Sequence, residues 1–154
     1  MYATLLFTHS LFRWLVLISL SYATVRGYQG YASGRVFTKT DDSVRHGTAT
    51  IAHIQLLLGA TLYFQSPVIR AFFTHVGESI RHLNTAFFGV IHIGVMFVSI
   101  VLITIGSALA KRRATDREKF RTMAVWFSVV LLLIFLAIPW PFSPWANRPY
   151  FRAY

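Results

Sequence analysis

Three histidines of this 154-residue chain lie inside long apolar stretches, where ionisable side chains are rare and usually functional. They are His9, His53 and His92, each in a different stretch. Imidazole nitrogens bind haem iron, zinc and copper. The alternative for each histidine is a hydrogen bond to a neighbouring helix. Three such residues together favour a shared role as ligands.

The other candidates for redox or metal chemistry are few. The chain has no cysteine, which excludes disulfides, thiolate-bound iron–sulfur clusters and the covalent attachment of c-type haem. His46, His75 and His82 fall near expected helix ends or in a loop, within reach of water. We interpret these three as interfacial polar residues.

Four apolar stretches surround the histidines, at residues 3–25, 47–66, 83–110 and 122–140. About 20 apolar residues in a helix cross the roughly 30 Å of bilayer hydrocarbon. The chain is 55% hydrophobic and 13% charged, whereas roughly a quarter of the residues in soluble domains are charged. The sequence predicts one all-α integral membrane domain over residues 1–154, an up-down bundle of four transmembrane helices.

Lysine and arginine predict the orientation, because cytoplasmic connections carry more of them. The first and third connections hold ten, namely Arg26, Arg35, Lys39, Arg45, Lys111, Arg112, Arg113, Arg117, Lys119 and Arg121. The second connection and the tail hold four, namely Arg70, Arg81, Arg148 and Arg152. Both termini should therefore face the periplasm of a bacterial inner membrane. This placement also argues against nucleic-acid binding, despite the net charge of +10.

The depth of each histidine indicates what it can bind. At 1.5 Å per residue, His9 and His92 lie roughly 8 Å and roughly 13 Å from the periplasmic edge, and His53 roughly 19 Å. The first and third helices of an up-down bundle are diagonal, so His9 and His92 face each other. This predicts axial ligation of a b-type haem. His53 remains open as a partner of His92 or a ligand of a second haem, and a three-histidine zinc or copper site is less favoured.

A haem also needs space between the helices. Gly89, Ser99 and Gly106 share a helix face with His92, and Gly59 and Ala60 lie near the same depth on the second helix. Such a stripe of small residues can make room for a cofactor. It can equally let membrane helices approach closely.

Arg13 lies one helical turn beyond His9, roughly 13 Å deep, and requires an anion, carbonyls or water. Haem propionates would serve as its partners. Two alternatives remain, a first segment lying along the interface that lets Arg13 reach water, and a carboxylate from a partner subunit. All acidic residues are expected outside the helices, namely Asp41, Asp42, Glu78, Asp116 and Glu118.

Four segments resemble a family of small bacterial four-helix membrane proteins, common in the Bacteroidetes and labelled cytochrome b-like. They are residues 9–14 (HSLFRW), 53–59 (HIQLLLG), 102–106 (LITIG) and 138–142 (IPWPF). The resemblance spans nearly the whole chain and implies haem b. In that family a glutamate often precedes the third-helix histidine, whereas Ile91 precedes His92 here.

Together these patterns predict a membrane b-type cytochrome that relays electrons through a bis-histidine haem. Quinol and respiratory subunits are the expected redox partners, and the chain would then belong to a quinol-linked membrane oxidoreductase or form a homo-oligomer. The alternative is an accessory or assembly subunit of a larger membrane complex, without a cofactor of its own.

The orientation is testable with reporter fusions. A fusion after Arg113 should read as cytoplasmic and one at Tyr154 as external, because ten of the fourteen connecting cations lie on the cytoplasmic side. The opposite pattern would mean that the depths of His9 and His92 were counted from the wrong face.

Overall fold

The computed structural model describes residues 1–151, so Arg152 lies outside the described residues. All of its regular secondary structure is helical, with no strand in the described part. Its α-helices are α1 (Tyr2–Ser33), α2 (Lys39–Gln65), α3 (Pro67–Thr74), α4 (Val76–Ser79), α5 (Leu83–Ala86), α6 (His92–Arg112) and α7 (Asp116–Ala137). A π-helical turn, η1 (Phe87–Ile91), joins α5 to α6 without a break.

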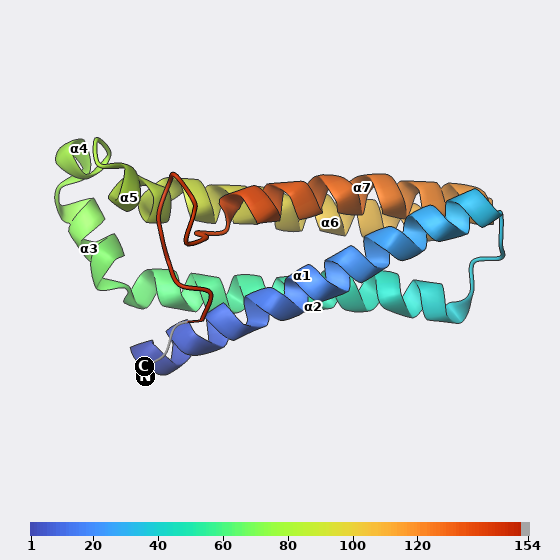
Figure 1. Ribbon diagram of the computed structural model, residues 1–154, viewed down its shortest axis with the longest axis horizontal. Coiled ribbons are helices and arrows are strands. Elements are labelled where there is room, and N and C mark those ends of the chain that lie inside the picture. The colour runs from blue at the N-terminus through green and yellow to red at the C-terminus, as the bar shows by residue number, and fades with distance from the viewer. Residues whose placement is uncertain (152–154) are drawn as a thin grey trace.

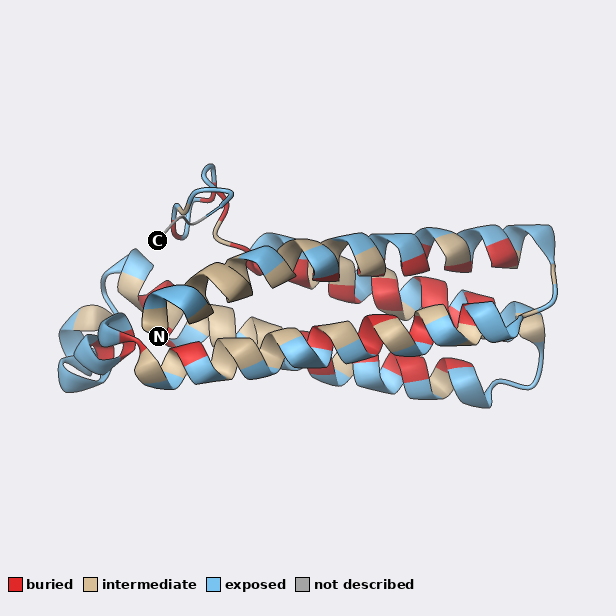
Figure 2. Ribbon diagram, turned by 90° about the horizontal axis from the view of Figure 1, so that it is seen from below, coloured by how far each residue is buried: buried red, intermediate tan, exposed pale blue. Residues whose placement is uncertain are grey.

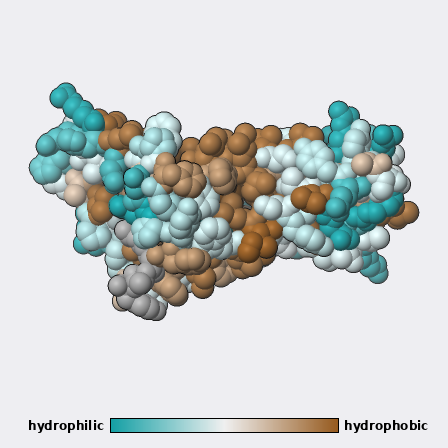
Figure 3. Space-filling model, in the orientation of Figure 1, coloured by the Kyte–Doolittle hydropathy of each residue, from teal (hydrophilic) through white to brown (hydrophobic). Residues whose placement is uncertain are grey.

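Three helical stretches are long and apolar enough to cross a membrane, namely α1, Leu83–Arg112 and α7. The pair α2 and α3 qualifies as a fourth span if it is counted as one, with a bend of 58° between its halves. The predicted all-α multi-pass membrane protein is therefore confirmed. Figure 3 shows hydrophobic residues around the middle of the molecule and hydrophilic ones gathered toward its two ends.

The four long helices lie side by side (Figure 1). α1 packs against α2 and α7, and α6 packs against α7 and α2. As a result α1 and α6 lie across the bundle from each other. The faces turned inward hold the buried residues (Figure 2), including the fully buried Leu20, Ile103 and Phe127.

Two helices begin earlier than their apolar stretches predicted. α2 starts with a capping box between Thr38 and Asp41, and α7 with one between Thr115 and Glu118. In a capping box the threonine and the acid satisfy each other's backbone N–H groups, so each helix extends into its polar flank. The expectation that all acids lie outside helices is therefore wrong. All five lie in helical turns: Asp41, Asp42, Glu78, Asp116 and Glu118.

The other two boundary differences concern α1 and α7. α1 continues past residue 25 to Ser33 and stops at Gly34, whose φ of 65° suits a residue without a side chain. α7 stops at Ala137 rather than 140, two residues before Pro139, because proline cannot donate the next helical hydrogen bond. Residues 138–151 then fold back over the open end of the bundle toward α1 (Figure 1).

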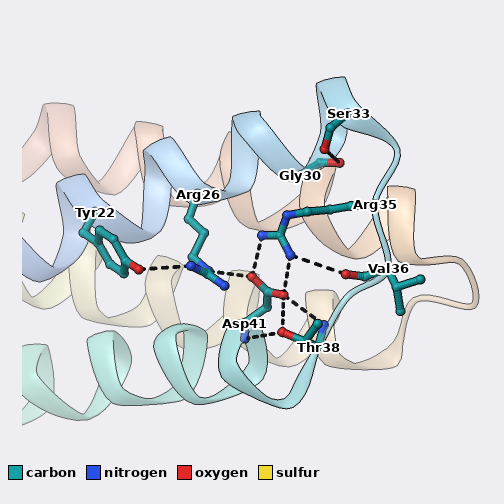
Figure 4. A network of polar contacts seen from close by, with 8 residues as sticks. All are labelled: Tyr22, Arg26, Gly30, Ser33, Arg35, Val36, Thr38 and Asp41. Atoms are coloured by element: carbon teal, nitrogen blue, oxygen red, sulfur yellow. Dashed lines mark hydrogen bonds and ion pairs between the residues drawn. The ribbon is translucent and has the colours of Figure 1, made fainter.

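One buried carboxylate ties the end of α1 to the start of α2 (Figure 4). Asp41 is fully buried and pairs with Arg26 at 2.6 Å and with Arg35 at 2.7 Å. The backbone N–H and hydroxyl of Thr38 also donate to it, at 2.9 and 2.7 Å. The hydrogen bonds that Arg35 donates to Asp41 raise the pKa of Arg35, so the pair stays ionised. Arg26 also donates to the hydroxyl of Tyr22 at 3.0 Å.

Asp41→Asn should destabilise the protein because it removes the negative charge on which two arginines converge. The expected loss in unfolding free energy is about 2–4 kcal/mol, measured by thermal or denaturant unfolding in detergent. Asp116→Asn is the matched control, since Asp116 forms only a partly exposed pair with Lys119 at 3.2 Å. Equal losses for the two variants would show that the Asp41 network is no more than a surface contact.

Candidate functional site

A cavity of about 240 Å³ lies within the half of the bundle that holds the N-terminus and residues 138–151. α1, α2, α3, η1, α6 and the returning tail all contribute to its wall, and the end of α7 closes it. Most of the wall is aliphatic. Besides the tyrosines Tyr2 and Tyr63, the ionisable or amide side chains that line it are His9, Arg13, Gln55, His92 and Arg148. The structure thus brings together three of the four predicted site residues.

His92 is oriented by the chain around it. It is the first residue of α6, directly after the π-helical turn, and such turns frequently mark functional sites. Its Nδ1 lies 2.8 Å from the carbonyl oxygen of Ala137. A carbonyl only accepts, so Nδ1 carries the proton and Nε2 keeps a free lone pair. Histidine ligands of metals are commonly oriented by this kind of second hydrogen bond.

His9 faces the cavity from α1 and contacts Gln55 of α2. The Gln55 amide nitrogen donates to the His9 carbonyl at 3.0 Å and lies 3.4 Å from His9 Nε2. His9 Nδ1 and Gln55 Oε1 are both buried without a hydrogen-bond partner in the described part of the chain. Gly59 leaves room beside the ring, since a Cβ there would come within 3.1 Å of His9 Cε1.

Arg13 is held by the returning tail. It donates to the carbonyl of Tyr150 at 2.5 Å, and its guanidinium lies 5.4 Å from the ring of Trp14 and 5.7 Å from that of Trp140. Its Nε is buried with no hydrogen-bond partner among residues 1–151. No carboxylate within the same residues pairs with it. The tail carbonyl therefore satisfies only part of this cation.

α1 is one continuous helix from Tyr2 to Ser33, so no break separates the first dozen residues from the rest of the helix. At 32 residues, α1 is longer than the roughly 20 residues that cross the hydrocarbon. The candidate partners of Arg13 are therefore still an anionic cofactor, water at the interface and a carboxylate from another subunit.

His53 lies apart from the cavity. Its side chain is exposed, its Nδ1 donates to the Ala49 carbonyl at 2.7 Å, and its Nε2 lies 3.2 Å from the hydroxyl of Thr104. Nowhere in residues 1–151 do three His, Cys, Asp or Glu side chains gather to hold a metal ion. A three-histidine metal site is thus wrong. His46, His75 and His82 are exposed, as their interfacial interpretation requires.

The small-residue stripe of α6 mainly serves helix packing. A Cβ at Gly89 would come within 2.7 Å of the Phe72 ring of α3, and Gly106 lies against Trp126 of α7. Aromatic rings therefore fill the space that these glycines open. Gly59 and Ala60 of α2 do line the cavity. The expected room for a cofactor is therefore found beside Gly59 and Ala60, whereas Gly89 and Gly106 do not provide it.

Three further residues of the site escaped the sequence interpretation. Tyr63 donates from its hydroxyl to the Gly89 carbonyl at 2.7 Å, within the π-helical turn before His92. Gln55 carries an amide within an apolar run, two residues after His53. This polar residue could have been recognised in the sequence as a candidate for the site. Arg148 could not be found, because its place depends on how the tail folds back.

In comparisons with protein-family models, curated proteins and solved structures, nothing matches this chain. The residues themselves must therefore test the haem hypothesis. Two imidazoles, two arginines and unpaired buried polar atoms on one cavity fit a haem and its propionates. The volume of about 240 Å³ falls below the roughly 300–1,000 Å³ of typical small-molecule sites, so the cavity has to widen when a porphyrin binds.

Proposed function

We propose that this chain is a membrane cytochrome that holds a b-type haem between His9 and His92. One observation carries the proposal. Four buried side-chain atoms in residues 1–151 have no hydrogen-bond partner, and three of them belong to cavity residues, namely His9, Arg13 and Gln55. Unpaired buried polar atoms are costly, and their concentration at one cavity points to a ligand that pairs with them.

The cavity residues would bind the iron and the propionates of the haem. His9 and His92 would hold the haem iron from the diagonal helices α1 and α6, and the Ala137 carbonyl keeps His92 in the tautomer with Nε2 unprotonated. Arg13 and Arg148 neutralise propionates on the side of the returning tail. A haem held in this way supplies one-electron transfer. The apolar wall excludes water and so favours a fixed coordination.

The proposal includes the membrane topology and the partners. The chain would cross a bacterial inner membrane four times as an up-down bundle, with α2 and α3 as one bent span and both termini in the periplasm. The asymmetry of lysine and arginine supports this orientation. Quinol or a respiratory subunit would deliver or accept the electron. The resemblance of four segments to cytochrome b-like membrane proteins points to the same cofactor.

A second function is favoured by the small volume of the cavity. An accessory or assembly subunit without a cofactor would need no more space than about 240 Å³. In that case a carboxylate from another subunit would form the ion pair that Arg13 lacks within this chain's described residues. The two functions differ in a property that is visible in the purified protein.

Purified protein from cells supplied with a haem precursor should be red. The dithionite-reduced spectrum should show a sharp α-band, and acidified acetone should extract the haem, because b-type haem is not covalently attached. A colourless preparation would sink the electron-transfer proposal. Co-purification of a stable partner subunit would then support the accessory function.

Substitution of the histidines should identify the ligands. His9→Ala and His92→Ala should each lose haem or convert it to a high-spin form that binds carbon monoxide, because each removes one axial bond. His53→Ala is the matched control and should keep a low-spin spectrum, since His53 lies apart from the cavity. Arg13→Leu should keep both ligands but weaken haem retention or shift the potential. Loss of the low-spin spectrum in His53→Ala alone would contradict the pairing across α1 and α6.

A further inference from the structure

A second hollow lies at the opposite end of the bundle, where α6 ends and α7 begins. It has a volume of about 350 Å³ and is separate from the histidine cavity. Five of its six residues are spaced three or four apart on α7, so they form one helix face. The groove is lined by Arg113, Glu118, Arg121, Thr122, Val125 and Trp126.

Two arginines form its outer rim. Arg113 is the C-cap residue of α6, and its Nε donates to the hydroxyl of the buried Thr122 at 3.2 Å. This bond holds the guanidinium in place and leaves its two terminal nitrogens for another acceptor. Arg121 projects from α7 beside it. In the described part of the chain neither arginine pairs with a carboxylate.

The nearby acids already have other partners. Asp116 pairs with Lys119 at 3.2 Å. Glu118 accepts from the backbone N–H and hydroxyl of Thr115, at 3.3 and 3.0 Å, to cap α7. Residues 111–121 hold six cations and two anions, so the rim carries a local excess of positive charge. It is a surface that attracts anions.

The floor of the groove is apolar and continues into the membrane-spanning part of α7. Val125 is exposed, and Trp126 packs against Gly106 of α6. Below Val125, the exposed side chains of Val129 and Leu132 follow at spacings of four and three, on the same helix face. Tryptophan is typical of the level at which hydrocarbon meets headgroups. The groove is therefore cationic at the rim and apolar below it.

We propose that this groove binds the headgroup phosphate of an anionic phospholipid, with the acyl chains lying along the exposed face of α7. Arg113 and Arg121 bind the phosphate oxygens, and Thr122 positions Arg113. Basic pockets between transmembrane helices on the cytoplasmic side are suited to such headgroups. A soluble phosphate would use the two arginines but not the apolar floor. This site is independent of the haem proposal.

Native mass spectrometry in detergent tests the site. Protein titrated with phosphatidylglycerol should retain one lipid strongly, and protein titrated with phosphatidylcholine should not. Arg113→Gln with Arg121→Gln should weaken phosphatidylglycerol binding about 30-fold, the loss expected for two arginines near an anionic surface. Arg113→Lys with Arg121→Lys keeps both charges and should retain most of the binding.

Arg70→Gln with Arg81→Gln is the matched control, because it removes the same charge from the opposite end of the bundle. Equal weakening in this control would show that the lipid responds only to net charge. Competition by millimolar inorganic phosphate would identify a soluble anion as the occupant instead. Equal retention of the two lipids by the unmodified protein would overturn the proposal by itself, whether or not any variant folds.

Discussion

The structure depends on one constraint, which is that polar groups surrounded by hydrocarbon must find partners within the protein. Helices pair the backbone N–H and C=O groups with one another, and most buried polar side chains also have a hydrogen-bond partner. Ser99 donates to the carbonyl of Val95, and Arg45 binds both Asp42 and Ser107. The exceptions are therefore informative. Within residues 1–151, three of the four unpaired buried atoms belong to residues of one cavity, and only that of Thr24 lies elsewhere.

The two ends of the bundle meet the same constraint in different ways. At the basic end, Asp41 forms ion pairs with Arg26 and Arg35, and these pairs fix the connection between α1 and α2. At the end that holds the termini, aromatic rings and backbone carbonyls replace carboxylates. There Trp14 and Trp140 lie 5.8 Å apart and flank Arg13. One end is thus fixed by ion pairs, whereas the other leaves a cation only partly satisfied. This difference explains why the candidate site lies at the second end.

The histidines show how far residue type alone can mislead. His9, His53 and His92 look equivalent in the sequence, because each is an imidazole within an apolar run. Only His9 and His92 line the cavity. His53 is exposed, and its two ring nitrogens already have neighbours in the Ala49 carbonyl and the Thr104 hydroxyl. The direction in which a helix turns each side chain depends on how it packs against its neighbours, and hydropathy along the chain does not contain that information.

The sequence by itself determined that the chain is helical and membrane-spanning, because about 20 apolar residues in a row can satisfy their backbone in lipid only as a helix. It also pointed to His9, His92 and Arg13, because ionisable groups at such depth are rare. Only the tertiary structure decided that Gln55 and Arg148 join them, and that aromatic rings fill the stripe of small residues on α6. These relations join residues far apart in the chain, and they exist only once helices and tail have packed.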